Sequence, residues 1–480
     1  MICIDFQPSR PHFLCIRPFL GRSSKASQWF LITLQEVFKH PTTNKQPMTN
    51  DSFEHNSAET PKAQQQPLSE YVPSPSPQEN GNDNGNDNDN ATETLFEEVN
   101  RMYTIREAIN EAKRCLHCKV PQCKKACPIE NNIPDFIHEL SMGNMGEAMN
   151  VLHEKTNLPA ICGRVCPHEK QCEGHCVLGK KGRPVRIGKL ESFIAQFDSD
   201  MQLTHERIPE KTRGKVAIIG SGPAGLTVAG DLARQGFHVT IFEGQPEAGG
   251  VLMYGIPEYR LPKAVVRNEI KKIEDLGVHF VRNCLVGTPE SGVTVDSLFA
   301  EGFDAIFMGT GTALPQNLSI PGSDLRRVTQ STDFLHNVNA YVEGALPMEM
   351  VPLRKGDKVA VIGGGNVAMD AARTARRLGA DVTVIYRRTQ AEMPAIQSEY
   401  EDAVKEGVNF MWQTNSLEFL GNKKGRVCAI RLSTPDGECT EPFDRVFLAI
   451  GSLPAASSAQ RRALRSTRKD MSSWANARWA

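Results

Sequence analysis

One pattern, an apolar run followed by a glycine-rich turn and a helix, occurs twice in this chain and constrains its fold most. Residues 215–226 and 358–369 agree at six of twelve positions without a gap. After each, a second short apolar run follows the helix, at 239–242 and 382–385. Strand, turn, helix and strand in this order are typical of a dinucleotide-binding βαβ unit. The sequence therefore predicts an α/β fold with two Rossmann-like domains.

The first glycine turn has the spacing of a pyrophosphate-binding loop. Gly220 permits the tight turn, Gly222 lets the backbone approach a phosphate, and Gly225 lets helix and strand pack closely. Glu243 ends the next apolar run, 23 residues after Gly220. An acid there accepts a hydrogen bond from a free ribose 2′-hydroxyl, which FAD and NAD carry and NADP lacks. The alternative is a glycine turn that binds nothing.

The second glycine turn differs where the ribose would lie. Its motif residues are Gly363, Gly365, Asn366 and Ala368. The residue 23 positions after Gly363 is Tyr386, and Arg387 and Arg388 follow it. Two guanidinium groups suit a 2′-phosphate, because arginine is a forked donor with a permanent charge. The two turns together predict one site for FAD and one for NADPH, although a solvated arginine pair at a strand end is the alternative.

Eight of the thirteen cysteines fall in one short region. Their spacing is Cys115-x2-Cys118-x4-Cys123-x3-Cys127-Pro, then Cys162-x3-Cys166-Pro-x4-Cys172-x3-Cys176. Closely spaced cysteines that end before proline are typical of ferredoxin-type iron–sulfur ligation. A zinc site is the alternative, although zinc ribbons usually show two separate C-x2-C pairs. Free thiolates in a large chain favour a reducing compartment, the cytoplasm. Helices are expected around them at 105–114 and 145–154.

Charge and composition exclude two classes of partner. The formal net charge is −1, so the chain offers no basic field for nucleic acid. It has no uninterrupted apolar run of about 18 residues, so a membrane span is not expected.

Residues 41–92 are rich in Pro, Gln, Ser, Asn and Asp. Such a stretch cannot offset its ordering entropy, and residues 1–92 are therefore expected to form a disordered extension. Met48 is a possible true start.

Several longer motifs resemble the small (beta) subunit of NADPH-dependent glutamate synthase. They lie at residues 115–127, 158–167, 249–257, 260–262 and 363–377. The resemblance runs from about residue 95 to 451, and dihydropyrimidine dehydrogenase and ferredoxin–NADP oxidoreductase subunits share the same modules. It implies a helical iron–sulfur domain at 93–205, an FAD domain at 213–345, an NADPH domain at 346–451 and an atypical tail at 452–480.

The family organisation implies two [4Fe–4S] clusters. By position, one cluster would use Cys115, Cys118, Cys123 and Cys176, and the other would use Cys127, Cys166, Cys172 and Glu191. Cys162 is then left out, although its spacing alone would include it. The resemblance also places Gly250 and Arg260 at FAD, and Gly451 near the nicotinamide and flavin.

The function implied is electron input. NADPH would reduce FAD, and the clusters would pass the electrons to a large (alpha) subunit that makes glutamate from glutamine and 2-oxoglutarate. The alternatives are electron input to dihydropyrimidine dehydrogenase, to ferredoxin or to another flavin-bearing acceptor. No residue is assigned as a catalytic acid or nucleophile. The tail lacks the family's closing Gly-Asp segment, so a truncated chain that binds a partner without turnover is a further alternative.

Overall fold

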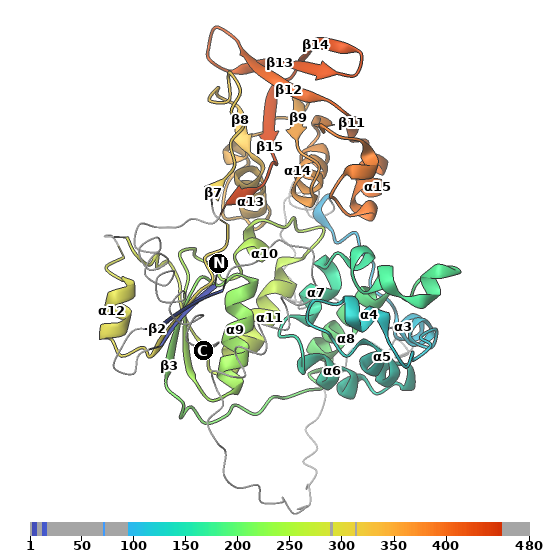
Figure 1. Cartoon of the computed structure of the whole chain (residues 1–480), viewed down its shortest axis with the longest axis vertical. Helices are drawn as coiled ribbons and strands as arrows, with labels where there is room; N and C mark the ends of the chain where they lie inside the picture. The colour runs from blue at the N-terminus through green and yellow to red at the C-terminus, as the bar shows by residue number, and fades with distance from the viewer. Residues whose placement is uncertain are drawn as a thin grey trace, which may run out of the picture.

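The computed structural model describes residues 71–72, 95–288, 291–312 and 314–453, and the backbone of strands β1 (Ile2–Phe6) and β2 (His12–Ile16). Within these ranges, no helix combines the length and the apolar character needed to cross a bilayer. The expectations for Met48, for the rest of the N-terminal extension and for the tail after residue 453 lie outside the described residues. Figure 1 shows three lobes.

The first lobe is helical and carries the clustered cysteines. Its helices are α3 (Ile105–Ala112), α4 (Gln122–Ala126), α5 (Ile133–Met142), α6 (Met145–His153), α7 (Pro159–Val165) and α8 (Ile187–Met201), with the short 3₁₀ turns η2 (His168–Lys170), η3 (Glu173–His175) and η4 (Val177–Lys180). The helices predicted near residues 105 and 145 are confirmed. Thr104 and Glu107 cap α3 reciprocally. Helix α8 is buried along most of its length, so it forms the centre of this lobe.

The second lobe is an α/β domain built on one sheet, whose strand order is β2-β1-β6-β3-β4-β5. Its parallel strands are β3 (Lys215–Ile219), β4 (His238–Phe242), β5 (His279–Val281) and β6 (Ala305–Met308), and its helices include α9 (Pro223–Arg234), α10 (Val251–Tyr254), α11 (Lys263–Asp275) and α12 (Val295–Ala300). Strand β1 pairs antiparallel with β6 and covers the free backbone groups of that edge. Two short segments of the expected disordered extension thus have strand structure.

The third lobe repeats the α/β arrangement, with strand order β11-β10-β9-β15-β8 (Figure 1). Its parallel strands are β8 (Val328–Gln330), β9 (Lys358–Ile362), β10 (Asp381–Ile385), β11 (Asn409–Met411) and β15 (Arg445–Leu448), and its helices are α13 (Ser331–Val342), α14 (Asn366–Arg377) and α15 (Gln397–Lys405). An antiparallel sheet of β12 (Asn415–Gly421), β13 (Val427–Thr434) and β14 (Gly437–Pro442) lies beside it.

The two α/β lobes are equivalent in detail. Strands β3 and β9 have the same burial pattern, and so do β4 and β10. In the second lobe, the Asp304 carboxylate accepts a hydrogen bond from the backbone of Lys215 at 2.7 Å. In the third lobe, Asp444 accepts one from Lys358 at 3.0 Å. The repeat predicted from the glycine turns therefore extends to the strand that closes each unit.

The boundary between the α/β lobes differs from the one expected at residues 345 and 346. Strand β8 precedes that point, yet it is the edge strand of the third lobe's sheet and pairs with β15. The chain crosses between the lobes in β7 (Leu314–Pro315) and returns in β16 (Ser452–Leu453), and these two strands pair with each other. The boundary therefore falls at β7, because sheet pairing decides to which lobe β8 belongs.

The helical lobe shares one hydrophobic core with the second lobe. Buried side chains of α5, α6, α7 and α8 belong to the same cluster as those of α9 and α11. Asn157, just before α7, donates to the backbone oxygen of Thr227 at 2.9 Å and to the Asp231 carboxylate at 2.7 Å. The cysteine-bearing helices are thus fixed against the first glycine-turn domain.

Candidate functional site

The first glycine turn is packed as closely as its motif predicts. Gly220 has a φ of +99°, which favours glycine, and a Cβ there would lie 2.7 Å from the Gly309 carbonyl oxygen. A Cβ on Gly225 would lie 2.0 Å from the carbonyl oxygen of Gly220. No heavy atom lies within 4 Å of the Cβ position of Gly222, so the space beside this glycine is free for a ligand. The turn leads directly into α9, whose N-terminus attracts anions.

Glu243 lies at the end of β4, against this turn. Its carboxylate accepts hydrogen bonds from the Ser221 backbone at 3.0 Å and the Gln245 backbone at 2.8 Å, and from the Ser221 hydroxyl. Gly250 is also brought to the turn, because a Cβ on it would lie 3.0 Å from Cα of Gly222. The structure thus brings the three turn glycines, Glu243 and Gly250 together.

A glycine segment that follows β6 also contacts this turn, and the sequence analysis did not predict it. Gly309 touches Gly220, as noted above, and Gly311 has a φ of +67°. The signal was present, because residues 304–311 and 444–451 share the pattern Asp-x-Ile/Val-Phe-Met/Leu-x-x-Gly. In each lobe, this segment supports the glycine turn from the neighbouring strand.

We expect Gly225→Ala to disrupt the first glycine turn. The added methyl group would overlap the Gly220 carbonyl oxygen, so strand β3 and helix α9 must separate, at a cost of about 1–3 kcal/mol. Thermal unfolding and retained flavin after gel filtration measure both effects. Gly146→Ala in α6 is the matched control, because its Cβ position has no neighbour within 4 Å. Equal flavin retention in the two variants would contradict the assignment.

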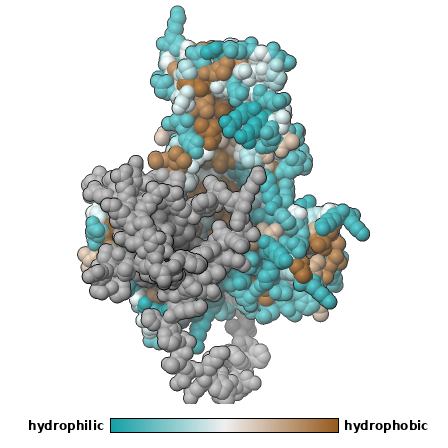
Figure 2. Space-filling model, in the orientation of Figure 1, coloured by the Kyte–Doolittle hydropathy of each residue, from teal (hydrophilic) through white to brown (hydrophobic). Residues whose placement is uncertain are grey.

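The second glycine turn borders a cavity of about 830 Å³. Among the residues that line it are Gly363, Gly365, Asn366, Arg387, Arg388 and Gly451. Gly363 has a φ of +139°, and a Cβ there would lie 2.3 Å from the Ala449 carbonyl oxygen. Ala368 is buried in the first turn of α14 and packs into the core of this lobe. Figure 2 shows hydrophobic residues exposed on the same lobe.

Arg387 and Arg388 follow strand β10 and are exposed at the rim of this cavity. The buried Tyr386 precedes them, and its ring lies against Gly364 in the turn. The cavity is therefore open to solvent at an end with two permanent positive charges, and a phosphate group can enter there.

Four cysteines meet at the outer end of the helical lobe. Cys115, Cys118, Cys123 and Cys176 together line a cavity of about 30 Å³. Burial raises the pKa of the Cys115 thiol, and burial raises that of Cys123 to about 11. The nearby Cys176 raises both further. Cys176 thus joins three cysteines that precede it by more than fifty positions, in the set that the resemblance implies.

Cys127, Cys162 and Cys172 lie near Glu191 on helix α8. The pKa of the Glu191 carboxyl is well above its usual range because the group is fully buried, and nearby Cys162 raises it further. Burial also raises the pKa of Cys127 and of Cys172, and the nearby Glu191 carboxylate contributes to both. A hydrogen bond links Cys162 to Cys166 and raises the pKa of Cys162. Cys162 therefore lies inside this second group, although the resemblance leaves it out.

The donor sets consist mainly of cysteine thiols, as iron–sulfur ligation requires. Among the residues that the structure describes, no three His, Cys, Asp or Glu side chains lie close enough to bind one ion. A four-iron cluster is larger than an ion and needs its thiolates further apart, each on its own corner iron. Cysteine thiolates are the ligands that such clusters use. Each group contains at least three of them, and each of these thiols is buried or half-buried.

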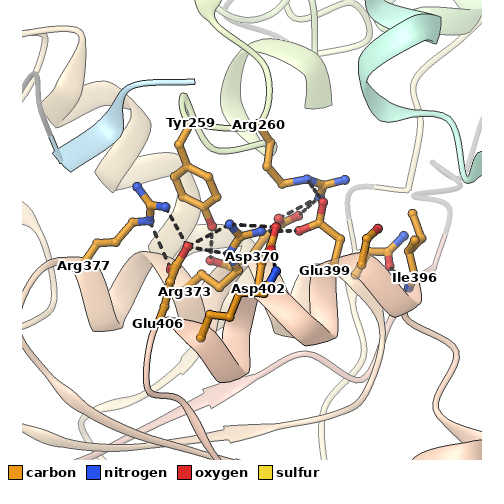
Figure 3. A network of polar contacts seen from close by, with 12 residues as sticks. Tyr259, Arg260, Asp370, Arg373, Arg377, Ile396, Glu399, Asp402 and Glu406 are labelled. Carbon is orange, nitrogen blue, oxygen red and sulfur yellow. Dashed lines mark hydrogen bonds and ion pairs between the residues drawn. The ribbon is translucent and has the colours of Figure 1, made fainter. Parts of the chain in front are cut away.

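Arg260 lies in a buried ion network between the second and third lobes (Figure 3). Its guanidinium donates to both oxygens of Asp370, at 2.7 and 2.9 Å, and pairs with Glu399 at 2.9 Å. Burial alone would lower the pKa of Arg260, but the two carboxylates raise it above its usual range. The side chain that the resemblance places at FAD is therefore directed toward α14 and α15.

Comparisons with known proteins agree with this division of the chain. A family model described as dihydropyrimidine dehydrogenase domain II, 4Fe-4S cluster, matches residues 92–203. A second, described as pyridine nucleotide-disulphide oxidoreductase, matches residues 214–471. The matched regions meet between α8 and β3, where the helical lobe ends.

Three relatives illustrate the range of similar proteins. The glutamate synthase [NADPH] small chain of Halomonas elongata is 36% identical over 75% of this chain and 79% of its own. The NAD-dependent dihydropyrimidine dehydrogenase subunit PreT of Salmonella typhimurium is 34% identical over 74% of this chain and 82% of its own. The putative oxidoreductase AegA of Escherichia coli is 37% identical over 76% of this chain, which spans 58% of that relative.

Proposed function

Because this chain belongs to the pyridine nucleotide-disulphide oxidoreductase family and carries a 4Fe-4S domain, we propose that it is an electron-input subunit of glutamate synthase. In this role it oxidises NADPH and delivers the electrons to a large subunit that makes glutamate from glutamine and 2-oxoglutarate. The similarity to glutamate synthase small chains supports this partner. A reducing compartment, the cytoplasm, suits its free thiols.

One observation carries the proposal: the chain combines two different glycine turns with two cysteine groups. The first turn lies against an acid, Glu243, that suits a ribose hydroxyl, and the second borders a cavity where Arg387 and Arg388 suit a phosphate. When bound, FAD would supply the conversion between the two-electron chemistry of NADPH and the one-electron chemistry of iron–sulfur clusters. The chain itself positions the two dinucleotides, because the backbone groups of its glycine turns bind their phosphates.

We assign the metal ligands in two sets. The first cluster is held by Cys115, Cys118, Cys123 and Cys176, and the second by Cys127, Cys166, Cys172 and Glu191. The pocket that the first set lines, and the effect of Glu191 on the pKa of Cys127 and of Cys172, support this division. Cys162 is then a half-buried thiol that lies beside the second cluster.

The electron acceptor is expected to dock beside the first cysteine group. Leu116 and Val120 are 61% and 55% exposed there, and they lie next to Cys115 and Cys118 in sequence. The exposed Lys119 lies between them, so an acidic rim on the partner is favoured. The first group is therefore the exit for electrons, and the second group lies deeper in the chain.

The test of the proposal separates electron input from electron delivery. The chain alone is expected to reduce an artificial dye with NADPH, and glutamate is expected only when the large subunit is added. Leu116→Glu should reduce glutamate formation about tenfold or more, because a charge is buried at the interface, while dye reduction is unchanged. Met350→Glu is the matched control. The Met350 side chain is similarly exposed, at 56%, but it lies in the third lobe.

Two results would contradict the proposal. A chain that holds flavin and iron but reduces no dye is a partner-binding chain without turnover. A chain that reduces dye but supports dihydropyrimidine formation with a pyrimidine-reducing subunit, and no glutamate formation, has the second candidate function. That candidate is favoured by the family description of the 4Fe-4S domain and by the similarity to PreT.

A further inference from the structure

A short turn of the helical lobe contacts the third lobe directly. Turn η2 lies between Cys166 and Cys172, two residues of the second cysteine group. Within it, Lys170 Nζ donates to the backbone oxygens of Pro394, at 2.5 Å, and Ala395, at 3.2 Å. These partners lie more than two hundred positions further along the chain, so the contact exists only because the lobes are packed together.

The neighbouring Glu169 supplies the cap of helix α15. Its carboxylate accepts hydrogen bonds from the backbone of Gln397 at 3.1 Å and of Ser398 at 3.2 Å. Helix α15 has no cap from its own chain segment, because its N-cap residue is Ile396. A carboxylate satisfies free N–H groups at a helix start and interacts favourably with the helix dipole. The helical lobe therefore completes an element of the third lobe.

The segment held by η2 is part of the nucleotide cavity. Pro394 lines that cavity. The backbone of Ala395 donates to the Gly364 oxygen at 3.0 Å, and that of Ile396 donates to the Asn366 side-chain oxygen at 2.9 Å. Gly364 and Asn366 belong to the second glycine turn. Residues 394–396 thus lie between the dinucleotide turn on one side and η2 on the other, with hydrogen bonds to both.

Turn η2 is also held tightly within its own lobe. A Cβ on Gly174 would lie 1.9 Å from the Glu169 carbonyl oxygen, and one on Gly188 would lie 2.4 Å from the His168 ring. Gly188 is on α8, three positions before Glu191. Because close-packed segments move together, a shift of the turn is transmitted to the residues around the second cysteine group.

We propose that Glu169 and Lys170 are positioning residues that couple dinucleotide binding in the third lobe to the second cysteine group. They hold residues 394–398 in the conformation that supports the second glycine turn. By reciprocity, a dinucleotide that orders this turn also restrains η2 and the ligand-bearing loop around it. This inference rests on the proposed function, since it takes the occupant of the cavity to be NADP(H).

The test measures binding and local order in the iron-loaded full chain. The Glu169→Ala, Lys170→Ala variant is expected to bind NADP⁺ about tenfold more weakly by calorimetry, because two contacts that support the turn are lost. Glu169→Gln keeps the shape and one acceptor oxygen, so it should give an intermediate affinity. Lys180→Met is the control, because Lys180 is an exposed lysine in η4. This variant should bind NADP⁺ as tightly as the unmodified chain.

Hydrogen exchange supplies a second readout that does not depend on turnover. In the unmodified chain, NADP⁺ should slow exchange both at residues 363–369 and at residues 166–174. In the double variant, protection at 363–369 should persist while protection at 166–174 is lost. If NADP⁺ protects neither segment of the unmodified chain, the proposed function itself is overturned. If it protects 363–369 alone, or if the variants bind as the unmodified chain does, only the coupling is overturned.

Discussion

Alanine at Cys166 is expected to remove one iron–sulfur cluster and leave the other. Iron content should fall from about eight to about four atoms per chain, because each [4Fe–4S] cluster depends on its full ligand set. Alanine at Cys176 should cause the same loss from the first set. Electron delivery to the large subunit should fall at least about 100-fold in both variants, because the path through the clusters is broken. Iron analysis and EPR of anaerobically purified protein measure the outcome.

Cys162→Ala is the matched control, since Cys162 lies beside Cys166 but is not assigned as a ligand. It should retain all the iron, whereas Glu191→Ala should lose about half. Cys162 and Glu191 both lie within the second cysteine group, so the two variants together decide which residue is the fourth ligand. If Cys162→Ala loses half its iron and Glu191→Ala keeps it, the fourth ligand is the thiol and our second set is wrong.

The glycine turns could be predicted from sequence because their requirements are local. A positive φ at Gly220 and Gly363, and the close approach at Gly225, follow from the turn itself and are visible in the motif spacing. The strands and helices around them were also predictable, since short apolar runs next to a glycine turn are typical of a strand–turn–helix unit.

The grouping of the cysteines and the position of Arg260 depend instead on tertiary packing. Spacing alone cannot join Cys176 to Cys115, because the two meet only when the η turns fold back over α4. Arg260 was assigned to FAD by resemblance, yet its side chain pairs with Asp370, a residue 110 positions away. The contact of Lys170 with Pro394 is equally invisible in the sequence. The contacts of Arg260 and Lys170 require the packing of two lobes, and the cysteine grouping requires the folding of the helical lobe.

The third lobe's choice of nucleotide is expected to depend on its arginine pair. Replacing both Arg387 and Arg388 by alanine should lower kcat/KM for NADPH about 100-fold, which corresponds to the loss of two charge-assisted hydrogen bonds. The value for NADH should change less than about threefold, because NADH lacks the 2′-phosphate that the guanidinium groups would bind. Dye reduction with each nucleotide, at constant ionic strength, measures the ratio.

A control for net charge distinguishes this specific role from general attraction of anions. Lys423 and Lys424 are exposed in the turn between β12 and β13 and do not line the cavity. Alanine at both removes the same two charges, so any long-range effect on NADPH should appear there too and should diminish as salt is raised. The arginine variant should keep its altered ratio at high salt, because contact hydrogen bonds are screened less than distant charges. An unchanged ratio of kcat/KM values in the arginine variant would mean that the 2′-phosphate is recognised elsewhere or not at all, and the cavity would then have no basis for preferring NADPH.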